Sequence, residues 1–255
     1  KKKYLVTKEG NFEGSNILIE DKNYKPTDKE LNDIKNIENT LLKERKKRIK
    51  PFFDEKVQID LNCFWFYSNL YSSLILDDKD LYNHTVNSIE LLNQKIKNNI
   101  YHCYDKNKKG IDVFLEDYVY YSLLLITLYE IKNDKMSLDK CIRTMEETWK
   151  LFFNKDNNLL QKNILNINDL FVSPLEISDN NIPNGNSIYL FVCNKLFNIT
   201  NNKSWYEKKE ILSKSFNTFI NYNFSQMFSY LKILDICEDN ITVSLHGKIN
   251  NEKEL

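Results

Sequence analysis

Three clusters of polar residues in this 255-residue sequence carry side chains suited to ligand binding and proton transfer. Carboxylates exchange protons once their surroundings shift the pKa, and amide, hydroxyl and ammonium groups can hold the hydroxyls of a sugar or polyol. Each cluster comes just before, or at the start of, a long apolar segment. The clusters are Asp54, Glu55 and Lys56 with the nearby Asn62; Glu116, Asp117 and Tyr118; and the run from Pro183 to Ser187 (PNGNS).

The apolar segments that follow these clusters predict buried helices. The runs FWFYSNLYSSLIL, YVYYSLLLITLYE and SIYLFVCNKLF are apolar on nearly every side, and a helix of that kind must be buried. Each run is followed by an amphipathic segment with charge on one face. We therefore expect three helical hairpins, at about 57–97, 117–153 and 187–222, with the apolar helices inside and the amphipathic helices outside.

This repeated plan of two helices per unit is typical of a helical repeat architecture. The five glycines and four prolines are too few for a protein built of β-hairpins. We expect an all-α fold, an incomplete (α/α) six-hairpin toroid forming one domain over residues 1–255. Minor β segments are expected at Ser15–Glu20 and Ile241–Leu245, and an amphipathic helix is expected to begin near Thr27.

Parallel inner helices would place their N-termini, and the positive ends of their dipoles, along one rim. A neutral sugar or polyol would suit such a rim, so a small carbohydrate is the expected ligand. The candidate residues fall into two groups. The catalytic candidates are Asp54, Glu116 and Asp117, and the substrate-binding candidates are Lys56, Asn62, Tyr118, Asn186 and Ser187.

Each candidate also has a structural explanation, which stays open at this stage. Asp117 and Ser187 are good helix N-caps, and Asp54 with Lys56 could form a surface ion pair. Adjacent Glu116 and Asp117 point to different sides of a helix start, so they do not form the pair of facing carboxylates that a glycosidase needs. Asp54 with Asp117 could be such a pair.

Several other classes of function are disfavoured. The histidines His84, His102 and His246 fall outside the clusters, so we expect no histidine proton shuttle. The 36 basic and 36 acidic residues balance, which argues against a nucleic-acid or anionic membrane partner. The five cysteines are scattered, so we expect no disulfide framework, no metal site and no cofactor. No run is apolar over the ~20 residues of a membrane span, and we expect a soluble protein of the cytoplasm or an organelle lumen.

Five segments, in this order and spacing, resemble the spermatogenesis-associated protein 20 family, which includes the bacterial YyaL-type proteins. Where the family has a W-N-G sequence, this chain reads Leu61, Asn62 and Cys63, and in its P-S-G-N-S sequence Asn184 replaces the serine. The segments are Asn11–Leu18, Arg48–Lys56 (RIKPFFDEK), Phe114–Tyr118 (FLEDY), Pro183–Ser187 and Ile241–Gly247.

The resemblance implies a toroid related to N-acylglucosamine 2-epimerases and six-hairpin glycosidases, with epimerase- or glycosidase-like activity. It also implies a thioredoxin-like domain and a first part of the toroid preceding the region seen here. We therefore expect no thioredoxin-like domain within residues 1–255, and expect the missing N-terminal part or another subunit to complete the ring.

Two other hypotheses stay open. The helices could form an inert scaffold or protein-interaction module that supports a thioredoxin-like domain. They could also form an unrelated α-solenoid adaptor, whose inner helices would line an exposed groove with no polar focus.

Overall fold

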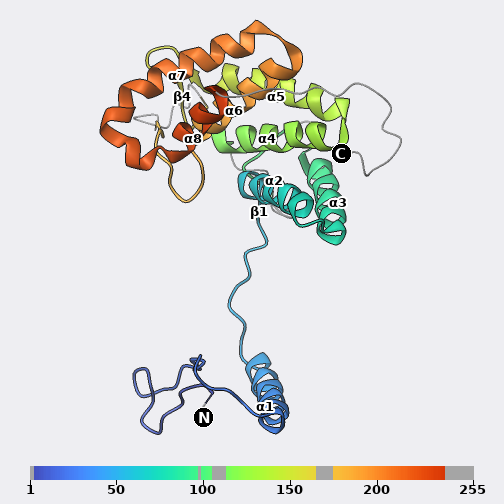
Figure 1. Cartoon of the computed structure of the whole chain (residues 1–255), viewed down its shortest axis with the longest axis vertical. Helices are drawn as coiled ribbons and strands as arrows, with labels where there is room; N and C mark the ends of the chain where they lie inside the picture. Colours follow the sequence, from blue (N-terminus) through green and yellow to red (C-terminus); the bar gives the residue numbers. More distant parts are fainter. Residues whose placement is uncertain (1–2, 97–98, 105–112, 165–174, 239–255) are drawn as a thin grey trace. The chain divides into compact units, whose positions relative to one another are not determined.

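The computed structural model describes residues 3–96, 99–104, 113–164 and 175–238, and these are mostly helical (Figure 1). The chain divides into two compact units, Lys1–Asp54 and Glu55–Leu255. The single domain expected over residues 1–255 stays a prediction. All residues from 47 to 56 are exposed, so this segment contributes nothing to a core. The two units are described separately.

The first unit contains one long helix, α1 (Asp28–Lys46). Thr27 and Glu30 form the expected capping box, in which each side chain accepts a hydrogen bond from the other residue's backbone N–H. Every residue of α1 is at least partly exposed. The strand expected at Ser15–Glu20 is wrong: these described residues form no strand, because only Ser15 makes a bridge, to Phe12. The other expected strand, at 241–245, lies outside the described residues.

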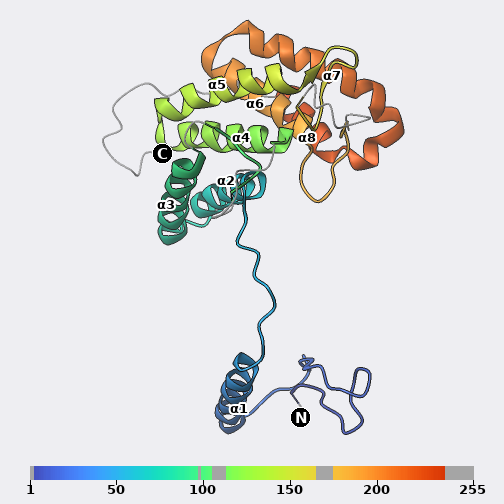
Figure 2. The same cartoon turned by 180° about the vertical axis from the view of Figure 1, so that it is seen from behind.

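The second unit consists of three helical hairpins followed by a short helix (Figures 1 and 2). Each hairpin pairs an apolar helix with an amphipathic one, as the sequence predicts. The tight connections begin with residues that stop helices, such as Asn133 and Asn201 in the left-handed conformation. The helices are α2 (Ile59–Ile75) and α3 (Lys79–Ile96); α4 (Leu115–Lys132) and α5 (Lys135–Phe152); α6 (Gly185–Thr200) and α7 (Lys203–Asn223); then a 3-10 turn, η1 (Phe224–Gln226), and α8 (Phe228–Glu238).

Two short antiparallel ladders link the hairpins where the sequence shows no strand pattern. In the first, β1 (Val57–Gln58) pairs with β2 (Cys103–Tyr104), with Gln58 opposite Cys103. In the second, β3 (Phe153–Asn154) pairs with β4 (Leu159–Leu160). The first ladder matters for the site, because β1 leads directly into α2 and so brings the residues before β2 beside the start of that helix.

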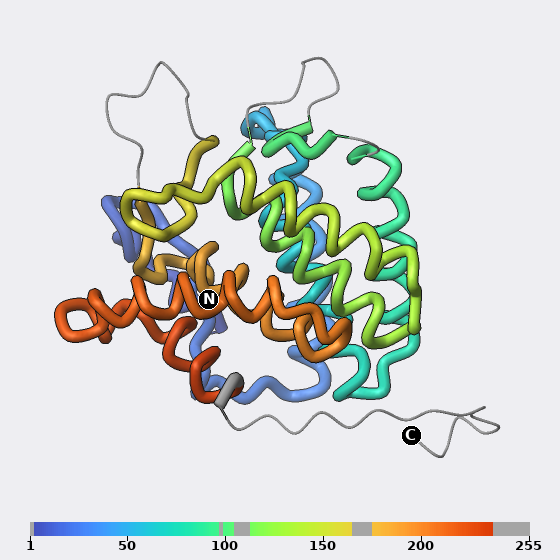
Figure 3. The backbone as a smooth tube through the Cα atoms, turned by 90° about the horizontal axis from the view of Figure 1, so that it is seen from above, coloured from blue at the N-terminus to red at the C-terminus, as the bar shows by residue number. Residues whose placement is uncertain are grey.

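The apolar helices form the inner layer. Helix α4 packs against both α2 and α6, and each outer helix packs against its inner partner (Figure 3). The centre of this layer is α4, which is buried continuously from Asp117 to Leu128. The expected all-α fold with minor β segments is confirmed. Among the described residues, the structure shows no helix that combines the length and apolarity needed to cross a bilayer.

Candidate functional site

A cavity of about 440 Å³ lies where the three inner helices begin, and we call it the rim cavity. Its walls include Asp60 at the start of α2, Glu116 at the start of α4, and Asn184 directly before α6. Since three helix N-termini line one cavity, the inner helices begin on a common side, as expected. Its walls also include His102, Lys162 and Glu176.

Asp117 fastens the start of α4. It is the third residue of the helix, and Oδ2 accepts a hydrogen bond of 2.8 Å from the backbone N–H of Phe114. Its side chain is fully buried. The expectation that Asp117 is the N-cap is therefore wrong by three positions, because Phe114 precedes the helix and Asp117 reaches back to it. Asp117 is absent from the lining of the rim cavity and lies behind it.

His102 lies between the rim cavity and Asp117 and contacts the Asp117 carboxylate. Its Nδ1 lies 3.0 and 3.2 Å from the two carboxylate oxygens of Asp117. The hydrogen bond to Asp117 raises the pKa of His102, and burial opposes that rise. The expectation that no histidine joins the polar clusters is wrong. The β1–β2 ladder, continued by the bond from Ile59 N–H to the His102 carbonyl, brings this residue to the start of α2.

Glu116 is the carboxyl group best suited to exchange a proton with a ligand. It lines the rim cavity, and its buried Oε2 has no hydrogen-bond partner in the described part of the chain. Burial raises its pKa to about 7, while Lys162 opposes the rise. A side chain at Gly185 would place Cβ 3.0 Å from Glu116 Oε1, so the glycine lets the start of α6 approach this carboxyl group.

Asp60 supplies a second carboxylate from α2. Burial raises its pKa, and Asp117 adds to the rise. Asp60, His102 and Asp117 each place a potential ligand atom within 4.8 Å of the others, a spacing that could hold a metal ion. Nδ1 of His102 already lies at hydrogen-bond distance from Asp117, so we assign these residues to hydrogen bonding.

An ion pair completes the wall of the rim cavity. Lys162 Nζ lies 2.7 Å from Glu176 Oε1. The backbone carbonyl of Glu176 accepts a bond of 2.6 Å from the side-chain amide of Asn184. Neither charged residue stands near a polar cluster in the sequence, and sequence reasoning missed both.

Two residues expected to bind substrate, Asn186 and Ser187, are buried at the start of α6. Both groups of the Asn186 side chain bond the backbone of Leu160 at 2.8 Å, which fixes β4 against the start of α6. Ser187 is fully buried and is not the N-cap expected from the sequence. Asn184 holds that position, since its side chain accepts bonds from the N–H groups of Asn186 and Ser187.

The remaining predicted residues are absent from the lining of the rim cavity. Asn62 donates to the Gln58 carbonyl at 2.6 Å, and Lys56 is exposed. The Tyr118 hydroxyl lies 3.5 Å from Glu147 in a different cavity. Asp54 belongs to the first unit and Asp117 to the second, and their pairing stays a hypothesis.

Comparison with known proteins defines the fold class. No family model matches the sequence, and no curated protein matches it. Among solved structures, the chain resembles a family 76 α-mannanase from Bacteroides thetaiotaomicron, with 18% identity and a TM-score of 0.57 over 74% of this chain and 55% of that chain. A family 76 mannosidase from Bacteroides thetaiotaomicron VPI-5482 matches with 11% identity and a TM-score of 0.50, over 63% of this chain and 44% of that chain.

These likenesses show that the chain has the all-α toroid fold of family 76 glycoside hydrolases. The chain spans about half the length of each of these two structures. At such low identities the likeness concerns the fold alone, and the chemistry has to be argued from the residues of the rim cavity.

Proposed function

We propose that the rim cavity binds a glycan and that Glu116 donates a proton to the oxygen of the glycosidic bond. The observation that carries this proposal is a cavity at the shared starts of three inner helices with a partly buried, unpartnered carboxyl group in its wall. Hydroxyl-rich ligands suit this place, because helix N-termini, an asparagine and a lysine offer donors and the carboxylates offer acceptors.

The environment of Glu116 fits the role of a general acid. A carboxyl group with a pKa of about 7 is protonated in a large fraction of molecules at neutral pH, whereas an ordinary glutamic acid is not. Burial, which causes the shift, also keeps water from competing for the proton. Activity should therefore fall as the pH rises above about 7.

Asp60 is the second carboxylate of the proposal. It comes from a different helix, so it can act on the sugar from a different side of the cavity than Glu116. Glycosidases use such a second carboxylate either to activate water or to attack the sugar. Asp117 has a positioning role, because it holds His102 and the backbone that leads into Glu116.

An α-mannoside is the first substrate to test, since the two related structures are named an α-mannanase and a mannosidase. Hydrolysis of manno-oligosaccharides should be measured for the native chain, for Glu116→Gln and for Glu90→Gln. Glu90 is an exposed residue on α3 and serves as the matched control. We expect Glu116→Gln to lower the rate about a hundredfold or more and Glu90→Gln to leave it unchanged. Equal rates for all three proteins would refute the role of Glu116.

An epimerase-like reaction is the second chemistry to test, and His102 is the observation that favours it. This imidazole lines the rim cavity and has Asp117 behind it, an arrangement that suits removal of a proton next to a carbonyl group. Incubation of N-acylated and simple hexoses in deuterated water distinguishes the two reactions. Epimerisation would be supported if the native chain exchanges a carbon-bound hydrogen for deuterium and His102→Gln does not. If the native chain shows no exchange, epimerisation is excluded for these sugars.

A scaffold function is the remaining candidate, and an exposed apolar surface on α2 favours it. We call Leu61, Trp65, Ile75 and Leu76 the open face; their exposed fractions are 46%, 63%, 81% and 70%. We propose that a further helical hairpin covers the open face and extends the ring. It would come from the rest of the same protein or from another subunit, and the thioredoxin-like domain implied by the family resemblance belongs to this proposal.

Quenching of tryptophan fluorescence tests this partner. A variant that keeps Trp65 and replaces Trp149 and Trp205 by phenylalanine reports on the open face alone. Acrylamide should quench Trp65 strongly in this 255-residue chain and weakly in a preparation that also contains the proposed hairpin, on the same chain or on another subunit. Equally strong quenching in both would show that the open face stays uncovered.

A further inference from the structure

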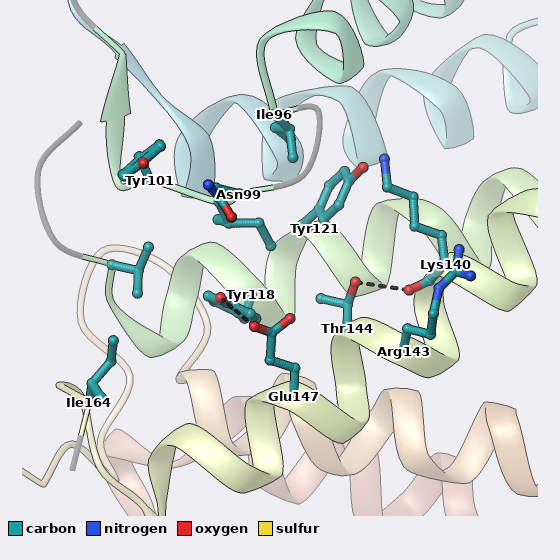
Figure 4. A pocket seen from close by; sticks show the side chains of 12 residues that line it. Ile96, Asn99, Tyr101, Tyr118, Tyr121, Lys140, Arg143, Thr144, Glu147 and Ile164 are labelled. Carbon is teal, nitrogen blue, oxygen red and sulfur yellow. Dashed lines mark hydrogen bonds between the residues drawn. The ribbon is translucent and has the colours of Figure 1, made fainter. Parts of the chain in front are cut away.

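A second cavity, of about 650 Å³, lies between the end of α3 and the hairpin of α4 and α5. It shares no lining residue with the rim cavity. Figure 4 shows its polar side chains: Lys140 and Arg143 of α5 lie together, and Glu147 lies further along the same helix beside Tyr118. The cavity therefore has a cationic end and an anionic end.

The cationic end of the second cavity consists of Lys140 and Arg143. Lys140 is partly buried, and its Nζ lies 5.0 Å from the centre of the Tyr121 ring and 3.5 Å from Asn93 Oδ1. Burial lowers the pKa of Lys140, and the charge of Arg143 lowers it further. Neither cation forms an ion pair within the described part of the chain. Partial burial of the Lys140 ammonium costs hydration free energy, whereas Arg143 is exposed to water.

Three carboxylates lie near these cations, and none of them forms an ion pair with either cation in the described part of the chain. Asp134 and Asp139 line an adjacent, smaller cavity together with Lys140 and Arg143. Asp134 caps α5, where it accepts bonds from the Met136 N–H and the Ser137 hydroxyl. Glu147 accepts from the Tyr118 hydroxyl at 3.5 Å. An anionic ligand could therefore form the ion pairs that Lys140 and Arg143 do not make with other described residues.

We propose that this second cavity binds a small phosphate monoester of a polyol or sugar. The phosphate would lie between the ammonium of Lys140 and the guanidinium of Arg143, which together offer a point charge and a planar fork of donors. The hydroxyl groups would face the other end, where Glu147 and Asn99 line the wall. The volume falls in the range of small-molecule sites, and Tyr118 and Tyr121 add apolar ring surface.

Calorimetric titration of the whole chain with glycerol 3-phosphate, inorganic phosphate and glycerol tests the proposal. We expect glycerol 3-phosphate to bind more tightly than inorganic phosphate, and glycerol not to bind. Lys140→Gln and Arg143→Gln should each weaken glycerol 3-phosphate about tenfold or more. Lys150→Gln, at an exposed position on the same helix, should have no effect. No binding, equal affinity for the two phosphates, or equal losses in all three variants would overturn the site.

Thermal unfolding separates a lost ligand group from a damaged fold. Without ligand, Lys140→Gln should keep or raise the Tm, because it removes a partly buried and unpaired charge. Glycerol 3-phosphate should raise the Tm of the native chain and of Lys150→Gln, and leave that of Lys140→Gln unchanged. A lower Tm for Lys140→Gln together with an undiminished ligand-induced rise would contradict the proposal.

Discussion

Helices α4 and α2 are both inner helices with nearly continuous apolar sequences, yet their surroundings differ. Among the described residues, α4 packs against the inner helices α2 and α6 and is buried from Asp117 to Leu128. In the same part of the chain, α2 packs closely against one inner helix, α4, and its buried residues are Ile59, Cys63, Leu70 and Ser73. The sequence of α2 is suited to a more enclosed position than the one it occupies here. The difference indicates that the array is open at α2 and closed at α4.

The largest loss of stability is expected from creating a cavity in the centre of α4. Leu124 is fully buried, so Leu124→Ala removes packing that its neighbours can replace only in part. We expect the free energy of unfolding to fall by about 2–5 kcal/mol. Urea unfolding followed by circular dichroism measures the loss. A loss below about 1 kcal/mol would mean that α4 is not the tightly packed centre of the unit.

The acidic residues at the second position of α2 and α4, Asp60 and Glu116, should respond to pH. Burial raises the pKa of Glu116 from 4.5 to about 7, so the folded protein binds a proton that the unfolded chain releases. Stability due to this group is therefore complete below pH 4.5 and is lost as the pH rises to about 7. Above that pH, Glu116→Gln should raise the free energy of unfolding by up to about 3 kcal/mol.

Asp60→Asn on α2 is the matched comparison, because burial also raises the pKa of Asp60. We expect a gain of the same sign but smaller, measured by urea unfolding at pH 4 and pH 8. A loss of stability at pH 8 in either variant would mean that its ionised carboxylate is stabilised by the fold, contrary to this account.

Replacing Asp117 should change the stability in the opposite direction from replacing Glu116 or Asp60. The Asp117 carboxylate accepts a hydrogen bond from Phe114 N–H and lies beside His102. Asp117→Asn should lower the free energy of unfolding by about 1–3 kcal/mol. The same change should lower the pKa of His102, which can be measured by NMR of the imidazole protons. Asp80→Asn, at an exposed first-turn position of α3, should change neither quantity. An unchanged His102 pKa in Asp117→Asn would refute the coupling.

The smallest effect is expected on the open face. Ile75 is 81% exposed, so Ile75→Gln should change the free energy of unfolding by no more than about 0.5 kcal/mol. The same urea titration tests it, with Leu124→Ala as the positive comparison. A loss of several kcal/mol would show that Ile75 is already packed in solution, and the contrast between α2 and α4 would disappear.

The sequence predicted the three hairpins well, because an apolar helix and an amphipathic helix differ in composition over many residues. It predicted less of the site. His102, Lys162 and Glu176 reach the rim cavity through short ladders and loops, whose long-range pairing leaves no periodic signal. One available signal was missed. Asp60, Glu116 and Asn186 occupy the same second position of α2, α4 and α6, so Asp60 could have been found by aligning the helix starts.

The most direct test of the rim cavity is a titration of the chain with manno-oligosaccharides, followed by the NMR signals of the histidine rings. His102 lines the cavity and His84 lies exposed on α3. We expect the His102 signals to shift and saturate at millimolar ligand while those of His84 stay in place, and we expect Glu116→Gln to weaken the response. If the His102 signals do not move, or if both histidines move together, the rim cavity is not a mannoside-binding site.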